Sequence, residues 1–220
     1  MKKALSLLLA LLLLMSLFAG CAKEKAKPSD EGAEEGSPLL KGRAWTDCVI
    51  VVDGVLYESF NDPYSKLKDN GWTPTGILNT TLDAKRAAVS GLEHINSKFD
   101  GRNGPRISVD FFNPYDTLKI IQDCNILNVE VDAMVGDVPY RAGDSGADFD
   151  FELPGGVKRG ATIDQIKAAY GDPAEEEDYG DYTLYTYKSD DNVFAVYLRV
   201  YPEYGLQRVK FSDRRWRNPG

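Results

Sequence analysis

The sequence predicts an α+β fold in which two small modules, each combining antiparallel strands with a short helix, follow a signal peptide and a flexible stalk. Three observations lead to this fold class: a leucine-rich apolar run near the N-terminus, a polar stretch after it, and then short apolar segments separated by turn residues. We expect the signal peptide over residues 1–20, the stalk over 21–43, the first module over 44–146 and the second over 147–220.

The N-terminus has the layout of a signal peptide. Lys2 and Lys3 precede an uncharged, leucine-rich stretch over residues 4–19. This stretch is shorter than the roughly 20 residues that a membrane-spanning helix needs. A segment of this kind directs a chain to export, so we expect the mature protein outside the cytoplasm.

The segment Leu17-Phe18-Ala19-Gly20-Cys21 resembles the lipobox of bacterial lipoproteins, with phenylalanine where that motif more often has leucine. The resemblance implies cleavage before Cys21 and acylation of that cysteine by at least two chains. At about 0.8 kcal/mol per buried CH₂, two chains give stable anchoring. The alternative is an ordinary signal peptide that happens to precede a cysteine.

The stalk supports the same interpretation. Residues 22–38 contain no large apolar side chain, so they cannot bury a core and should stay disordered as a spacer. We therefore expect a protein that is lipid-anchored at the extracytoplasmic face of the cell membrane and does not span it.

Composition narrows the classes of partner. About 175 residues follow the stalk, within the usual size of one domain or two small modules. Without Lys2 and Lys3, 24 basic and 34 acidic residues remain, a net charge of −10. This excess argues against nucleic acid as a partner and against binding of the folded part to anionic lipid head groups.

The first module should contain a hairpin, a short helix and two further strands. Asp53-Gly54 between two β-branched, apolar segments is a strong hairpin signal. Asp62 as N-cap, followed by Pro63, predicts the start of a helix. The expected elements are strands 48–52 and 55–57, a helix from 62 to about 69, Trp72 as a core anchor, and strands 106–112 and 125–131; residues 73–104 give no clear pattern.

The second module should begin after a loop rich in Gly and Asp, residues 136–146. Thr162 and Gln165 form a capping box that predicts the start of a helix. Gly171 supplies the left-handed position after its last turn, and Pro173 prevents continuation. Three strands at hairpin spacing follow, over 182–188, 193–200 and 206–212.

This second module carries a resemblance. The pattern Gly160-x-Thr162, Ile166, Tyr170-Gly171-x-Pro173, followed by three strands, resembles modules of the β-lactamase inhibitor protein and of the small lipoprotein of the outer-membrane barrel-assembly machinery. The resemblance covers about a third of the chain and consists mainly of caps and turns, so it implies no catalytic residue. It implies a protein-binding or envelope-assembly role.

Two cysteines remain once Cys21 is assigned to lipid. In an exported domain, Cys48 and Cys124 could form one disulfide, which would stabilise the fold by roughly 4 kcal/mol. They could equally lie apart as buried thiols. Both alternatives stay open, and neither cysteine has a metal-ligand neighbour in the sequence.

Few residues are candidates for catalysis or metal binding. His94 is the only histidine, which argues against a zinc site or a triad and favours a surface or hydrogen-bonded side chain. Asp148, Asp150 and Glu152 alternate with apolar residues and would share one face of a strand. They are a weak candidate for calcium, although a wet acidic strand face explains them equally well. The acidic run over 175–178 should be a solvated loop, and we expect no cofactor.

The tyrosines of the last three strands offer a candidate binding face. Alternation assigns residues 194, 196, 198 and 200 to the core and places Tyr197 on the opposite face. In the preceding strand Tyr185 and Tyr187 share a face. If that face also bears Tyr197, the sheet presents an aromatic surface suited to protein or glycan binding. The alternative, which we favour, is that the first module covers this face and makes its tyrosines an inter-module core.

These observations predict a non-catalytic binding or interaction module at the cell envelope, attached to the membrane by lipid and acting on an unknown protein or cell-wall partner. The first alternative is a cell-wall-directed hydrolase. The second is a solute-binding receptor, which is disfavoured because the expected alternation of strands and long helices is absent from the sequence.

Overall fold

The computed structural model describes residues 36–76, 79–96, 98–99, 104–135, 138–139 and 148–215. The predicted signal peptide, Cys21 and residues 22–35 of the predicted stalk therefore lie outside the described residues, as does most of the predicted loop over 136–146. Neither of the described α-helices has the length and apolarity that crossing a lipid bilayer requires.

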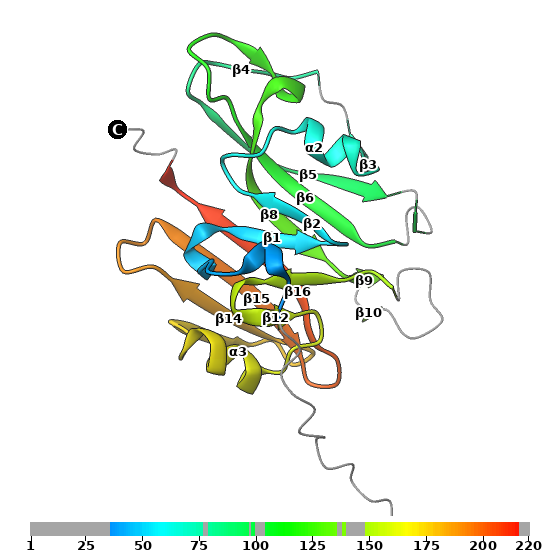
Figure 1. The fold of residues 1–220 in the computed structure, drawn as a ribbon, viewed down its shortest axis with the longest axis vertical. Helices are drawn as coiled ribbons and strands as arrows, with labels where there is room; N and C mark the ends of the chain where they lie inside the picture. The colour runs from blue at the N-terminus through cyan, green and yellow to red at the C-terminus, as the bar shows by residue number, and fades with distance from the viewer. Residues whose placement is uncertain are drawn as a thin grey trace, which may run out of the picture. The chain divides into compact units, whose positions relative to one another are not determined.

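Strands dominate the described residues, as expected for a strand-rich α+β fold (Figure 1). The α-helices are α2 (Ser65–Asp69) and α3 (Ile163–Tyr170). Short 3-10 helices are η1 (Pro38–Leu40), η2 (Trp45–Asp47), η4 (Ile121–Asp123) and η5 (Pro154–Gly156). The strands are β1 (Val49–Val52), β2 (Val55–Glu58), β3 (Trp72–Pro74), β4 (Thr81–Leu82), β5 (Ala87–Asn96), β6 (Arg106–Phe112), β7 (Lys119–Ile120), β8 (Asn125–Asp132), β9 (Met134–Val135), β10 (Val138–Pro139), β11 (Phe151–Leu153), β12 (Val157–Lys158), β13 (Glu175–Asp178), β14 (Thr183–Lys188), β15 (Phe194–Tyr201) and β16 (Gly205–Asp213).

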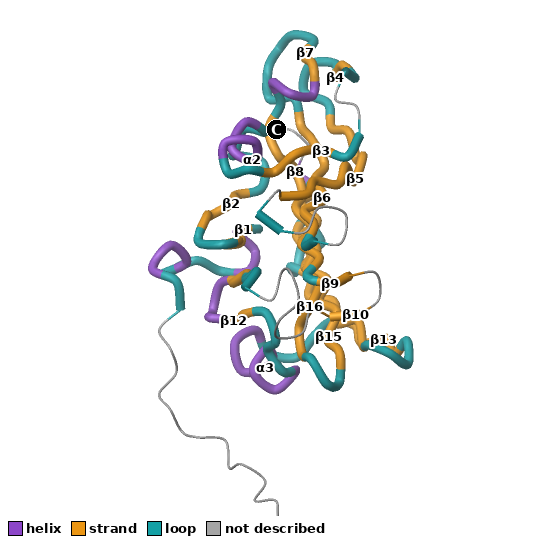
Figure 2. Tube along the Cα trace, turned by 90° about the vertical axis from the view of Figure 1, so that its right-hand side faces the viewer, coloured by secondary structure: helices purple, strands orange, loops and turns teal. Residues whose placement is uncertain are grey.

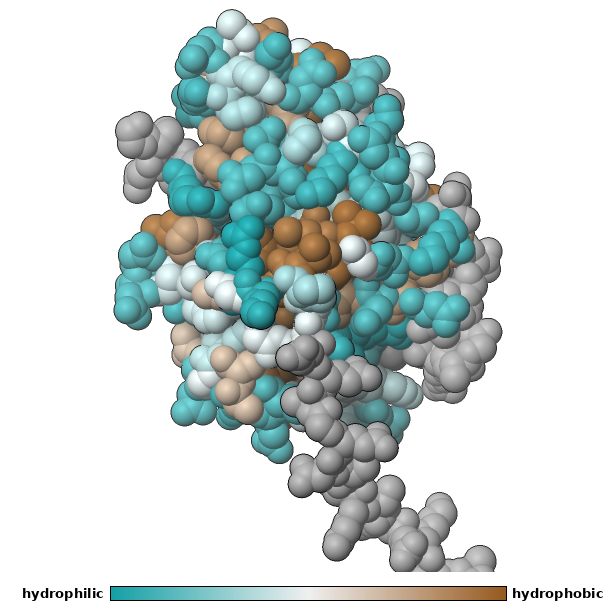
Figure 3. All heavy atoms as spheres, viewed as in Figure 1, coloured by the Kyte–Doolittle hydropathy of each residue, from teal (hydrophilic) through white to brown (hydrophobic). Residues whose placement is uncertain are grey.

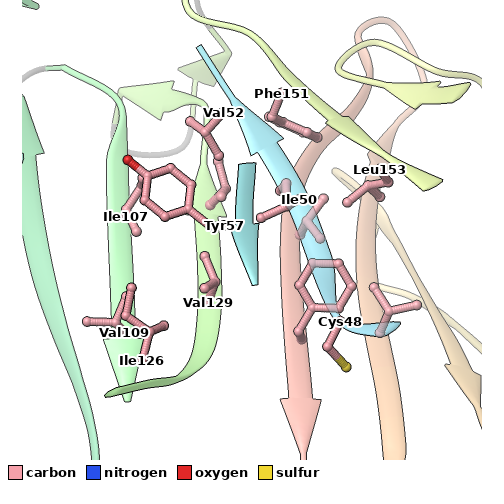
Figure 4. Close-up of a cluster of buried hydrophobic side chains, with 14 of the residues drawn as sticks. Cys48, Ile50, Val52, Tyr57, Ile107, Val109, Ile126, Val129, Phe151 and Leu153 are labelled. Atoms are coloured by element: carbon pink, nitrogen blue, oxygen red, sulfur yellow. The ribbon is translucent and has the colours of Figure 1, made fainter. Parts of the chain in front are cut away.

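Two sheets build the core. The large sheet has the order β13-β14-β15-β16-β8-β6-β5-β3, and the small sheet has the order β12-β11-β1-β2. The small sheet, α2 and α3 lie on the same side of the large sheet (Figure 2). Ile50 and Val52 of the small sheet point toward Ile107, Val109 and Val129 of the large sheet (Figure 4). Burial of these apolar side chains between the two sheets is the main favourable term for folding.

A second, smaller apolar cluster lies on the outer side of the small sheet. Val49 and Val51 of β1 are buried there beneath Leu40 of η1, with Leu56 partly buried beside them. Seen from this side, the surface is mainly hydrophilic and is interrupted by an apolar area (Figure 3). Residues 37–40, which were predicted to belong to the flexible stalk over 21–43, are thus held to the fold by this packing and by the bond from the Ser37 amide to Glu152. The prediction of a flexible stalk is wrong for this stretch, because Leu40 is apolar and finds a place in the core.

The two predicted modules do not form two separate units. All described residues belong to one compact unit. Strand β8, from the predicted first module, pairs with β16 of the second through Lys210 opposite Glu130, and β1 pairs with β11. The predicted boundary at 146–147 therefore divides strands that are hydrogen-bonded to each other. Hairpin patterns predict pairing only between strands that follow each other in the sequence. The pairs β8–β16 and β1–β11 join segments that are far apart in the sequence.

Several local predictions are confirmed. The β1–β2 hairpin turns at Asp53 and Gly54, which both have positive φ, as a type I′ turn requires. Thr162 and Gln165 form the reciprocal capping box at the start of α3. The predicted strands over 106–112, 125–131 and the three after α3 are present as β6, β8, β14, β15 and β16, and Trp72 is buried.

Three local predictions differ from the structure. Helix α2 begins at Ser65, because the Asp62 carboxylate accepts a hydrogen bond from the Glu58 amide (2.7 Å) and pairs with Lys66 instead of capping the helix. The acidic run 175–178 is solvated as expected, but forms the edge strand β13 rather than a loop. The long strand β5 lies in the stretch that gave no pattern, and it carries a β-bulge between Ala88 and Leu92.

Candidate ligand-binding site on the open face of the large sheet

The large sheet buries one face and presents a polar opposite face. Along β16, Val209 and Phe211 are in the core, whereas Arg208, Lys210 and Ser212 alternate with them and point the other way. An antiparallel sheet often has one face packed and one solvated. We call the polar side the open face.

The open face contains a hollow of about 370 Å³. It lies over the four strands β14, β15, β16 and β8, and reaches β6. Its lining is mainly charged or polar, with Tyr197 and Leu184 as larger apolar surfaces: Asp110, Asn128, Glu130, Leu184, Tyr197, Arg199, Arg208, Lys210, Ser212 and Arg214. Hollows of this size with convergent polar groups are typical of small-ligand sites.

Ion pairs organise the middle of the hollow. Arg208 lies 2.6 Å from Glu130 Oε1 through its Nε and 3.4 Å from Asp132 Oδ2 through its Nη2. Lys210 Nζ lies 3.4 Å from Glu130 Oε2. Burial raises the pKa of Asp132, partly offset by the neighbouring Arg208 charge. Glu130 thus bridges two cations, and its carboxylate is already engaged in the free protein.

Arg199 has a different environment. It lies directly across from Arg208 in the β15–β16 register, so two like charges face each other on the open face. Its guanidinium lies 4.9 Å from the centre of the Tyr182 ring, a cation–π contact. Among the described residues, no carboxylate lies within ion-pair distance of Arg199 or of Arg214.

A buried polar network supports the far side of the hollow. The Asp110 carboxylate accepts hydrogen bonds from the Gly91 amide and from Asn128 Nδ2, each at 2.8 Å. Asn128 Oδ1 accepts in turn from the Asp213 amide at 2.7 Å. These bonds tie β5, β6, β8 and β16 together, and a fully satisfied network of this kind makes a local structure rigid.

The proposed aromatic face is corrected by the register of β14 and β15. Tyr185 lies opposite Leu198 and Tyr187 opposite Val196, so both tyrosines are on the core side and are buried. Tyr197 lies opposite Thr186 on the open face and lines the hollow. Tyr185, Tyr187 and Tyr197 therefore do not share a face, and only Tyr197 belongs to a surface site.

Both remaining cysteines are free, buried thiols, so the structure contains no disulfide between Cys48 and Cys124. Burial raises the pKa of Cys48 to about 12 and that of Cys124 to about 11. At neutral pH both are protonated and poorly nucleophilic. They act as small apolar core residues.

His94 is part of the core rather than of a surface. Its Nδ1 lies 2.9 Å from the Leu92 carbonyl oxygen and its Nε2 3.2 Å from the Tyr64 hydroxyl. Burial lowers the pKa of His94. The side chain is fully buried and does not line the hollow, which leaves it a structural hydrogen-bonded role.

The calcium candidates do not form a site. Asp148 and Asp150 are exposed, whereas Glu152 is buried and accepts a hydrogen bond from the Ser37 amide at 2.6 Å. Among the described residues, no three carboxylate, histidine or cysteine side chains are grouped so as to hold a metal ion. The predicted alternation with apolar core residues is confirmed, because Phe149, Phe151 and Leu153 are buried.

Comparisons of the chain with protein-family models, with curated proteins and with solved structures each found no match. Sequence reasoning placed Tyr197 on the face of its strand opposite the core but did not identify the charges of β8 and β16 as its neighbours. The alternation of charged and apolar residues over 128–132 and 206–212 was the available signal.

Proposed function

We propose that this chain is a lipid-anchored protein of the cell envelope that binds a ligand without catalysis, through the hollow on the open face. One observation carries the proposal. One face of the large sheet packs against the core, and the other face has a hollow lined by charged side chains and Tyr197. Tyrosine and arginine, together with tryptophan, are enriched at binding hot spots.

The carboxylates of the hollow favour binding over hydrolysis. A wall hydrolase needs one carboxyl group that donates a proton and another that acts as base or nucleophile. Asp110 is held by Gly91 and Asn128, and Glu130 by Arg208 and Lys210. Both are committed to structure in the free protein. A solute receptor of two parallel-sheet lobes is also disfavoured, because every strand pair among the described residues is antiparallel.

The membrane attachment rests on the sequence around Cys21, and it has a direct test. Cys21→Ala should abolish acylation and move the protein from the membrane fraction to the soluble extracytoplasmic fraction. Fractionation of cells and metabolic labelling with a fatty-acid analogue measure both effects. Cys48→Ala is the matched control and should leave the location unchanged. An unlabelled wild type, or a Cys21→Ala protein that stays with the membrane, would show that the anchor is wrong.

The binding face is tested by photocrosslinking in living cells. A benzoylphenylalanine at position 197, within the hollow, should give a defined adduct with the ligand. The same residue at position 118, where the leucine side chain is 58% exposed and outside the hollow, is the control. Adducts are identified by mass spectrometry. Equal yields at the two positions, or none at 197, would contradict the proposal that this face is the binding surface.

A further inference from the structure

The hollow on the open face has a charge sign opposite to that of the whole chain. The chain has a net charge of −8, but the hollow is lined by four cations and two carboxylates. The carboxylates are used internally: Glu130 pairs with Arg208 and Lys210, and Asp110 accepts its two hydrogen bonds from neutral groups. Positive charge in a hollow of an acidic protein concentrates anions there.

At one end of the hollow, Arg199 makes no ion pair with a described carboxylate. Like charges directly opposite each other on adjacent strands destabilise a sheet, and Arg199 faces Arg208 in this way. Arg208 makes ion pairs with Glu130 and Asp132, whereas Arg199 makes no ion pair with a described residue. Its guanidinium lies over the Tyr182 ring, and its charge helps to lower the pKa of Asp132 from a longer distance. The ring holds the guanidinium in place without neutralising it, which leaves its donors available for an anion.

Arg214 is the second uncompensated cation, at the other end. It follows β16, six residues after Arg208 along the chain. At about 3.3 Å per residue, this separation corresponds to roughly 20 Å. Lys210 and Tyr197, which lie opposite each other in the register, form the middle of the hollow between the two ends.

We infer that the ligand of the hollow is an extended anion that carries carboxylate or phosphate groups at more than one position along its length. One group binds Arg199 beside Arg208, a second binds Arg214, and the body of the ligand lies across Tyr197. Arginine suits both kinds of group because its planar fork donates two parallel hydrogen bonds to either. This inference rests on the proposed function and specifies the class of ligand for that site.

The test measures binding of defined probes by titration calorimetry at low ionic strength. Galacturonic acid oligomers are the carboxylate probe and short-chain polyphosphate is the phosphate probe; their monomers and neutral maltooligosaccharides are the controls. We expect one oligomeric anion to bind at least about tenfold more tightly than its monomer, since a second charge-assisted contact is made. The neutral oligomers should not bind, and the anion that binds identifies the group.

Three variants assign the contacts. Arg199→Gln and Arg214→Gln should each weaken binding of the oligomer about tenfold, the loss of one charge-assisted contact. Lys68→Gln removes the same charge from an exposed position of α2, outside the hollow, and should leave affinity unchanged. Thermal midpoints within about 2 °C of wild type would show that the variants are folded, because neither arginine makes an ion pair with a described residue.

Any of these results would overturn the inference: no anionic probe binds, the monomer binds as tightly as the oligomer, or Lys68→Gln weakens binding as much as Arg199→Gln. The proposed function is judged separately, by the adduct at position 197. An adduct together with failure of every anionic probe would leave the binding face intact and reject only the anionic ligand. Probe binding that survives both arginine substitutions would place the anion elsewhere.

Discussion

Replacing Tyr187 with alanine should lower the free energy of unfolding by about 3–5 kcal/mol, as expected for deletion of a buried aromatic ring. Only 3% of Tyr187 is exposed. Its ring packs edge-on against Tyr170 at a centroid distance of 5.5 Å and lies 6.3 Å from Trp45. Its hydroxyl donates to the Gly171 carbonyl oxygen at 3.1 Å. The ring therefore joins β14 to both the C-terminal end of α3 and the segment before β1.

Two further variants separate the contributions. Tyr187→Phe keeps the ring and removes one hydrogen bond, so it should cost about 1 kcal/mol. Tyr197→Ala removes a ring of the same size from the open face and should cost much less than Tyr187→Ala, because surface truncations are usually small. Denaturant unfolding measures all three. Similar losses for Tyr187→Ala and Tyr197→Ala would mean that the two tyrosines have similar environments, in conflict with the register of β14 and β15.

The elements that the sequence predicts well are those whose signal is local. The Asp53-Gly54 turn, the Thr162–Gln165 capping box and the alternation of β15 each depend on residues within a few positions of one another. Their chemistry is complete without knowledge of the rest of the chain. For this reason their positions agree closely with the structure.

Pairings between distant strands have no such signal. Nothing local to β8 indicates that Glu130 will lie opposite Lys210, eighty residues later in the chain. The same limit explains the tyrosines. Alternation fixes which residues of β14 share a face, but the register with β15 decides whether that face is the one bearing Tyr197. Most of the candidate site is formed by pairings between distant strands. The sequence therefore could not predict which of its residues lie next to one another.

Two glycines that the sequence places in turns also lie at a tertiary contact. Gly160 precedes the capping box of α3, and Gly205 ends the turn between β15 and β16. The Gly160 amide donates to the Leu206 carbonyl oxygen at 2.8 Å, and the Leu206 amide donates to the Ala161 carbonyl oxygen at 2.9 Å. The backbone on either side of these two glycines is therefore joined by direct hydrogen bonds.

Gly205→Ala should accordingly lower the free energy of unfolding by about 3 kcal/mol or more, the sum of backbone strain and overpacking. Gly205 has φ +65°, and a Cβ there would lie 2.8 Å from the Ala161 carbonyl oxygen and would collide with the backbone of Gly160. Backbone atoms cannot rotate away as a side chain can. The thermal midpoint should fall by about 6 °C or more.

Gly180→Ala is the matched control for this prediction. Gly180 also has positive φ, +85°, but an added Cβ would meet no atom within 4 Å. Its substitution therefore measures the backbone strain alone, about 1 kcal/mol. The difference between the two variants reports the close approach of β16 to the segment before α3. Equal losses would show that this approach is looser than the structure has it, and the position of Arg208 and Lys210 on β16 would then be less firmly fixed.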